Sequence, residues 1–253
     1  MSFIHQTTPR IHFGLGALQK LGEELKRFSK GPVLVVTDPG VLKVGIAEQA
    51  AKASGRDCII FSNIEPDPSI DTALACAKAV RDAKASVIIG VGGGSVIDVA
   101  KAIAVGHATG LPIRSLLSGI RASSTFIDAA TPVIAVPTLP GSGSECNGTS
   151  VLIDEASWRK LSLHSDLAAP RVAILDPSYA ATAAPDVLAS SLADALCHAV
   201  EAGLSTQSSV ASDALARAAM VMIVDHASAA LGEDDADEDR ETALLQCLVA
   251  AGL

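Results

Sequence analysis

The chain has 253 residues, of which 49% are apolar, so it is long enough to form one large or two modest domains with a substantial core. Its formal net charge of -9 argues against a polyanionic partner, and only 3% of its residues are aromatic, too few for the stacking surfaces that single-stranded RNA or DNA usually needs. We therefore expect no nucleic-acid partner.

The cysteines and the N-terminus bear on the cellular compartment. The five cysteines are scattered, odd in number and without C-x-x-C spacing, which favours reduced thiols over a disulfide framework. Residues 1–10 lack the apolar core of a signal peptide, and no stretch reaches about 18 uninterrupted apolar residues. These features predict a soluble cytoplasmic protein with no membrane partner.

The first two thirds of the chain alternate between helical and extended patterns. In chain order we predict a helix over 16–28, a strand over 33–37, a helix over 44–53, a strand over 58–61, a helix over 69–83, a strand over 87–91 and a helix over 96–104. Residues 108–131 are mixed in character, and further extended segments follow at 133–137, 150–153, 158–163 and 172–175. Such alternation predicts parallel strands joined by right-handed crossovers, with ligands at the carboxyl ends of the strands.

After Asp176 and Pro177 the pattern changes to Ala-rich helical segments without a convincing strand. We therefore predict two domains, an α/β domain over 1–178 and an all-helical domain over 179–253.

A glycine run follows the predicted strand Val87–Val91, whose β-branched residues are typical of a strand covered on both faces. Gly92, Gly93 and Gly94 let the backbone approach a ligand where a Cβ would clash. A helix favoured from Ser95 onward would present its free N–H groups and its positive dipole end to an anion such as a pyrophosphate. A tight turn without a ligand stays open as the alternative, since short glycine runs are common.

Asp38 directly follows the predicted strand over 33–37. A carboxylate at that point can accept hydrogen bonds from ribose hydroxyls and repel a 2′-phosphate, which would favour NAD over NADP. On local evidence alone, a turn aspartate before Pro39 and Gly40 is the favoured interpretation. Asp38 precedes the glycines, whereas the usual Rossmann fingerprint places its acid about 20 residues after them.

Asp194 and His198 are four residues apart in a predicted helix, so they share one face and can converge on one metal ion. An oxygen and a nitrogen donor suit Fe, Zn or Mn without choosing among them. The alternative is an aspartate that only caps or orients a nearby histidine.

Taken in order, these motifs and several others resemble the iron-containing (group III) alcohol dehydrogenase family over essentially the whole chain. They are Gly92-Gly93-Gly94-Ser95 with Asp98 and Lys101, the segment Pro137-Thr138-Leu139-Pro140-Gly141-Ser142-Gly143-Ser144-Glu145, Lys160, Asp176-Pro177, and Asp194 with His198 and Glu201. The resemblance implies a parallel-sheet nucleotide-binding α/β domain followed by an all-helical domain, in a dehydroquinate synthase-like arrangement with a metal between the two.

The resemblance also implies roles for single residues. Asp38 matches the ribose-binding acid, and Gly93, Gly94 and Ser95 match the pyrophosphate loop. The other cofactor-binding positions that it implies are Asp67, Asp98, Thr138, Leu139, Ser142, Asn147 and Lys160. Asp194 and His198 match the first two metal ligands. Three positions depart from the family, since Leu139 and Asn147 stand where a threonine is frequent and Asp67 where an asparagine is.

The activity implied is hydride transfer between a nicotinamide cofactor and a small alcohol, which yields an aldehyde or ketone, with a divalent Fe or Zn ion as Lewis acid on the substrate oxygen. NAD is favoured over NADP, and a homodimer or larger homo-oligomer is expected. Two alternatives remain open: a metal-independent enzyme akin to maleylacetate reductases, and an inactive dinucleotide-binding relative.

The family supplies two further histidine ligands later in its helical domain, and residue 253 precedes them. We therefore expect a shortened relative with an incomplete helical domain. No proton-relay residue is assigned.

Overall fold

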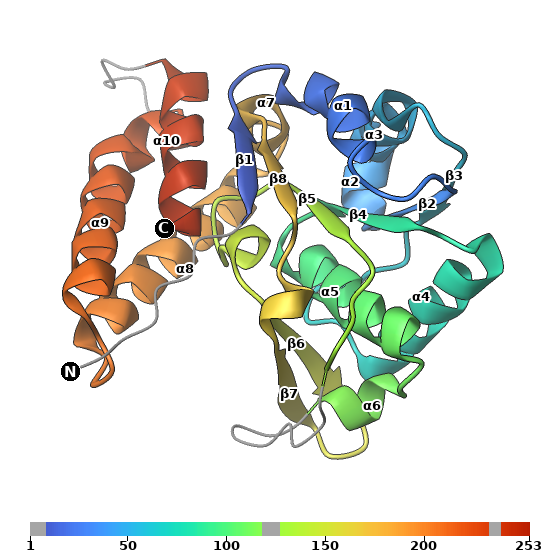
Figure 1. Ribbon diagram of the computed structural model, residues 1–253. Coiled ribbons are helices and arrows are strands. Elements are labelled where there is room, and N and C mark those ends of the chain that lie inside the picture. The colour runs from blue at the N-terminus through green and yellow to red at the C-terminus, as the bar shows by residue number, and fades with distance from the viewer. Residues whose placement is uncertain (1–8, 118–126, 233–238) are drawn as a thin grey trace.

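The fold is built on one six-stranded parallel sheet (Figure 1). The computed structural model describes residues 9–117, 127–232 and 239–253. The strands lie in the order β1 (Arg10–Phe13), β8 (Val172–Leu175), β5 (Val133–Pro137), β4 (Val87–Gly92), β2 (Val33–Thr37) and β3 (Cys58–Phe61), each parallel to its neighbours. Five of these strands confirm the sequence prediction. The edge strand β1 was not predicted, because none of its four residues is buried and it carries no long apolar run.

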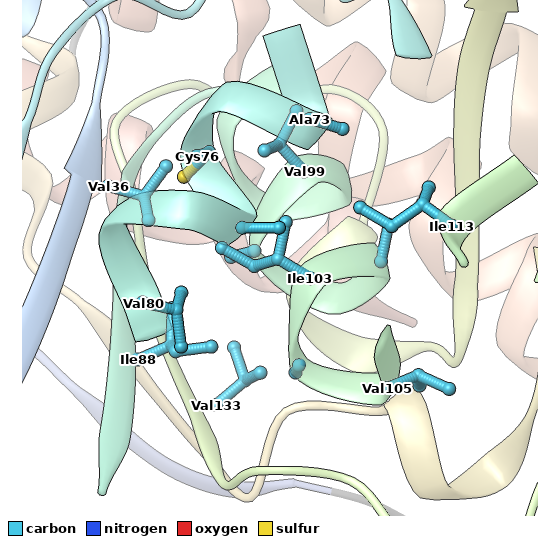
Figure 2. Packing of buried hydrophobic residues seen from close by; sticks show 14 of the residues in the cluster. Val36, Ala73, Cys76, Val80, Ile88, Val99, Ile103, Val105, Ile113 and Val133 are labelled. Carbon is cyan, nitrogen blue, oxygen red and sulfur yellow. The ribbon is translucent and has the colours of Figure 1, made fainter. Parts of the chain in front are cut away.

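Two helical layers bury the sheet, which explains why β2, β4, β5 and β8 are apolar on both faces. One face is covered by a 3₁₀ helix, η1, and by α1 and α3, and the other by α4, α5 and α6. Their bounds are η1 (Ala17–Lys20), α1 (Leu21–Leu25), α3 (Ile46–Ser54), α4 (Ile70–Ala83), α5 (Gly94–Thr109) and α6 (Ile113–Leu116). Figure 2 shows the second layer, where Val80 of α4 and Ile103 of α5 pack with Ile88 of β4.

The predicted helices differ from the observed ones mainly at their ends. The segment predicted as one helix over 16–28 is η1 followed by the short α1, and the short helix α2 (Pro39–Lys43) precedes α3. Helix α5 begins at Gly94 and ends at Thr109, where Gly110 in the left-handed conformation caps it.

The predicted extended pair is an antiparallel hairpin of β6 (Thr149–Asp154) and β7 (Arg159–His164), separate from the main sheet. It is attached beside α4, because Ile153 donates its backbone N–H to Pro68 O at 2.9 Å. The hairpin also packs on α5, because the backbone N–H of Val151 donates a hydrogen bond to Asp98 Oδ2 at 2.9 Å.

Helices alone follow β8 in the described residues, namely α7 (Pro177–Ala180), α8 (Pro185–Leu204), α9 (Val210–Leu231) and α10 (Arg240–Gly252). They pack on the β8 side of the sheet, where Leu175 shares a core with Leu188, Leu192 and Leu244. Among the described helices, α8 and α9 have the length and composition to cross a membrane, with mean hydropathies of 1.3 and 1.4. Core helices of soluble proteins also have such compositions.

The order of the strands creates a binding crevice. From β2 the chain moves outward to β3 and then returns to β4 on the other side of β2. In open parallel sheets, ligands bind at the carboxyl ends of the strands where the connections diverge in this way. The structure thus confirms the predicted fold class and places Asp38 and the glycine run at that edge.

Candidate cofactor and metal site

A cavity of about 300 Å³ lies at the carboxyl ends of β2, β4 and β5. Four residues predicted to bind the cofactor line it together: Asp38, Gly93, Thr138 and Leu139. The remaining lining residues come from α2 and its C-cap, from the connection into α8 and from the first turn of α8, and they are Gly40, Val41, Val44, Thr182, Ala183, Ala184 and Val187. The cavity therefore has a polar side on the strand ends and a largely apolar side opposite, which suits a nucleoside.

Asp38 both caps a helix and lines the cavity. It caps α2, because its Oδ1 accepts a hydrogen bond from the backbone N–H of Val41 at 2.9 Å. Its Oδ2 points toward the glycine run, 3.1 Å from the place where a Cβ on Gly92 would lie. One carboxylate oxygen is therefore fixed by the cap while the residue still lines the cavity.

The three glycines have different reasons to lack a side chain. A Cβ at Gly92, whose φ is +156°, would overlap Val96, and a Cβ at Gly94 would lie 2.9 Å from the Cβ of Ser142. Both glycines are therefore required by packing within the protein, which differs from the expectation that all three face a ligand. A Cβ at Gly93 would meet only Leu139, at 3.4 Å.

Gly93 also precedes the first turn of α5 as its N-cap residue, and no described side chain caps that turn. The free N–H groups of the turn and the positive end of the helix dipole are therefore available to an anion in the crevice.

On its inner face α5 carries Lys101, which is completely buried. Its Nζ donates hydrogen bonds to Ser144 O at 2.7 Å, to Asn147 Oδ1 at 3.1 Å and to Thr149 O, and it lies 3.4 Å from Asp98 Oδ1. Burial lowers the pKa of this ammonium, and the charge of Asp98 opposes that shift. Lys101 thereby holds the loop after β5 in shape.

The role of Lys101 is not among the sequence predictions. The available signal was a lysine three residues after an aspartate on an otherwise apolar helix.

Asp98 and Asn147 also form hydrogen bonds that shape the loop after β5. The carboxylate of Asp98 accepts hydrogen bonds from Ser144 Oγ and from the backbone N–H of Val151, the latter at 2.9 Å. The amide of Asn147 donates to Gly143 O at 3.0 Å and accepts from the backbone N–H of Thr149 at 2.9 Å. Both residues shape the loop and the hairpin, and a direct contact of either with the cofactor stays a prediction.

Glu145 is a second residue that sequence reasoning missed. It is 2% exposed, and its Oε1 has no hydrogen-bond partner among the described residues. Burial raises the pKa of Glu145 to about 7, although the nearby Lys101 charge acts in the opposite direction. Next to it, burial and the Glu145 charge raise the pKa of the Cys146 thiol to about 12, so this cysteine is inert at neutral pH.

The outer side of the α5 N-terminus is occupied by three predicted cofactor residues. Asp67, in a left-handed conformation with φ of 51°, donates its backbone N–H to Ser95 Oγ at 3.3 Å. Its Oδ1 pairs with Lys160 Nζ of β7 at 2.7 Å, and both side chains are more than half exposed. The structure therefore joins Ser95, Asp67 and Lys160 into one chain of contacts.

Asp194 and His198 lie on one face of α8, with 3.8 Å between Asp194 Oδ1 and His198 Nε2. Both side chains are about half exposed. Asp194 faces the loop after β5, since a Cβ at Gly141 would lie 3.6 Å from its Oδ2. This oxygen and nitrogen pair has the donor chemistry of an Fe or Zn site. In the described part of the chain, no three His, Cys, Asp or Glu side chains converge, so the pair provides two donors.

The strand order, the crevice and the uncapped helix beside it define the class, a doubly wound α/β protein with a ligand crevice at the carboxyl edge of its sheet. The sequence profile of the iron-containing alcohol dehydrogenase family matches residues 8–177. The chain belongs to this family.

Individual relatives support the assignment. The chain is 36% identical over 218 residues to long-chain-alcohol dehydrogenase 1 of Geobacillus thermodenitrificans, which covers 85% of this chain and 54% of that protein. It is 35% identical over 205 residues to an NADPH-dependent aldehyde reductase of Escherichia coli, which covers 79% of this chain and 51% of that protein.

Among solved structures, the sulfoacetaldehyde reductase of Bifidobacterium kashiwanohense in complex with NAD+ matches with a TM-score of 0.87 at 27% identity. That match covers 99% of this chain and 66% of the other, so the helical region is included in it. The chain thus spans about half the length of the two curated relatives and two thirds of this structure.

Proposed function

We propose that this chain binds NAD in the crevice and belongs to an oxidoreductase that interconverts a small alcohol and an aldehyde or ketone by hydride transfer. The observation that carries the proposal is the single cavity that brings together Asp38, Gly93, Thr138 and Leu139 from three strand ends. The named activities of the relatives, alcohol oxidation and aldehyde reduction, support the reaction class.

The preference for NAD over NADP rests on Asp38. Its carboxylate faces the cavity at the strand end, where it can accept hydrogen bonds from ribose hydroxyls and would repel a 2′-phosphate. One of the relatives is named as NADPH-dependent and another was solved with NAD+, so both preferences occur among similar proteins.

For the metal, Fe or Zn, we propose Asp194 and His198 as two ligands. When bound, such an ion polarises the substrate oxygen and stabilises negative charge on it. The protein's own contribution is placement: Gly93 and the first turn of α5 would hold the pyrophosphate, and Asp194 faces the neighbouring loop after β5 from α8. We further propose a soluble cytoplasmic homo-oligomer with domains over 1–178 and 179–253.

The test is a titration with NADH, in which the fluorescence of the nucleotide measures binding. Wild type should bind, and Gly93→Val should lose at least about tenfold in affinity because its side chain would fill the cavity. The backbone at Gly93 is extended, with φ of -74°, so valine can be accommodated without strain. Gly203→Val is the matched control, since a Cβ there meets nothing within 4 Å. Equal affinity of wild type and Gly93→Val would refute the assignment.

The alternative functions differ from the proposed one in whether NADH binding is accompanied by turnover and whether turnover requires a metal. A metal-independent reductase would turn over after exhaustive chelation. A non-catalytic relative would bind NADH and show no turnover with any alcohol or aldehyde under either condition. Elemental analysis combined with an activity screen on the same sample separates the three.

A further inference from the structure

The loop after β5 is in close contact with the last turn of α10. It contains the short 3₁₀ helix η2 (Ser144–Cys146), and Figure 1 shows the end of α10 beside this helix. A Cβ built at Gly143, whose φ is +59°, would overlap Ala251 O. A Cβ at Gly252 would lie 2.7 Å from Cys146 Sγ. The lack of a side chain at both glycines therefore allows the helix end to pack against the loop.

This contact also excludes water from a buried carboxyl group. Glu145 is 2% exposed, and its Oε1 lies 3.8 Å from the place where a Cβ on Gly252 would be. That oxygen has no hydrogen-bond partner among the described residues, which costs free energy while the end of α10 covers it. The packing of α10 on the loop has to offset this cost, so the contact is sensitive to small changes in fit.

The same loop reaches the cofactor cavity. Leu139 lines the cavity at the start of the loop. Ser142, which directly precedes Gly143, packs on the first turn of α5, since a Cβ at Gly94 would lie 2.9 Å from the Cβ of Ser142. Gly94 follows Gly93, which also lines the cavity. A shift of the part of the loop that contacts α10 would therefore move Ser142 and change the wall of the cavity.

We propose that the last turn of α10 positions the loop after β5 for the dinucleotide, with Cys146 and Gly252 as the positioning residues. Neither residue lines the cavity, so both act on the cofactor through the loop. When the sulfur and the glycine no longer fit together, the loop shifts and the affinity for the cofactor falls. This inference rests on the proposed function for its ligand, whereas the packing of α10 on the loop is measurable without a ligand.

The experiment titrates NADH into wild type, Gly252→Ala, Cys146→Ala and the double variant. Gly252→Ala should bind about three- to tenfold more weakly, because its Cβ would overlap the sulfur and push the loop and the helix end apart. Cys146→Ala leaves only a small void and should change the affinity by less than about twofold. In the double variant a methyl group replaces the sulfur, with 3.7 Å between the two Cβ atoms, and the affinity should return to within about twofold of wild type.

Hydrogen exchange without nucleotide provides the second measurement. In Gly252→Ala the backbone amides of residues 141–147 should exchange at least about threefold faster than in wild type, and the double variant should restore their protection. The amides of β2 and β4 lie in the centre of the sheet and should exchange as in wild type. This comparison separates a local shift of the loop from a general loss of stability.

Gly203→Ala is the matched control. Gly203 also lies in the last turn of a helix, α8, and a Cβ there meets nothing within 4 Å. The substitution adds the same methyl group at a helix end that does not contact the loop, so neither the NADH affinity nor the exchange of the loop should change.

The outcomes separate the inference from the proposed function. Unchanged NADH affinity in Gly252→Ala, a loss that Cys146→Ala does not reverse, or an equal loss in Gly203→Ala would each overturn the positioning by α10. If hydrogen exchange follows the expected pattern while none of the four proteins binds NADH, α10 still positions the loop and the proposed dinucleotide function fails.

Discussion

The crevice at the sheet edge and the donor pair on α8 were both predicted from short motifs, but the structure builds them in different ways. The crevice takes its residues from three strands and two connecting segments, and buried contacts such as those of Lys101 hold its loops. Asp194 and His198 lie on one helix, half exposed, with positions fixed by helical spacing alone. A site assembled from many elements depends on the whole fold, whereas a pair on one helix needs only that helix.

The largest expected effect comes from removing the buried charge that supports the crevice. Lys101→Met should lower the free energy of unfolding by about 3–5 kcal/mol, because Asp98 and several carbonyl oxygens would lose their buried partner. Urea denaturation measures this change. Lys78→Met, which breaks an exposed pair on α4, should cost less than about 1 kcal/mol. Similar losses in both variants would show that burial of Lys101 has no special importance.

A smaller effect should follow from the pH dependence of Glu145. Its folded-state pKa of about 7 lies above the ordinary 4.5, so between these values the folded protein binds more protons than the unfolded chain. The contribution of the neutral Glu145 to stability is therefore present at low pH and is lost as pH rises toward and through about 7.

In Glu145→Gln this loss should be absent. The stability of the variant relative to wild type should increase by about 1–3 kcal/mol between pH 5 and pH 8. Denaturation midpoints across that range test the prediction, with the exposed Glu201→Gln as control. Parallel pH profiles for wild type and Glu145→Gln would contradict the proposed burial of an ionisable carboxyl.

Cofactor choice should respond by a smaller amount again. Asp38→Asn removes the charge but keeps the cap on α2, since asparagine caps helices as well as aspartate does. The ratio of the NADPH and NADH dissociation constants should fall about tenfold, which corresponds to about 1.4 kcal/mol. Wild type that binds both nucleotides equally would show that Asp38 acts only as a cap.

The sequence predicted those features that follow from strand ends and helical spacing. Asp38, Gly93 and Thr138 converge because the carboxyl ends of parallel strands share one edge. The support for the loop was not predictable, because the contacts of Lys101 reach residues 43 to 48 positions away in the sequence.

The role of the glycine run was also only partly predictable from the sequence. Its composition predicted close approach to the backbone, but the neighbours of Gly92 and Gly94 are protein side chains that only the folded structure identifies. Strand β1 escaped prediction for the opposite reason, since an edge strand without a buried residue has no apolar pattern to detect.

The smallest effect is expected at Asp194 and His198, where the comparison with the crevice is tested most directly. With two protein donors, a first-row metal ion depends on water for the rest of its coordination shell. The 253-residue chain should therefore bind Zn²⁺ or Co²⁺ weakly. After dialysis against a mild chelator it should retain far less than one equivalent of metal. His198→Ala should abolish this weak binding and change the stability by less than about 0.5 kcal/mol, since the side chain is half exposed. His164→Ala on β7 is the control. One tightly held ion per chain would contradict the prediction, and it would mean that further ligands reach α8 from another subunit.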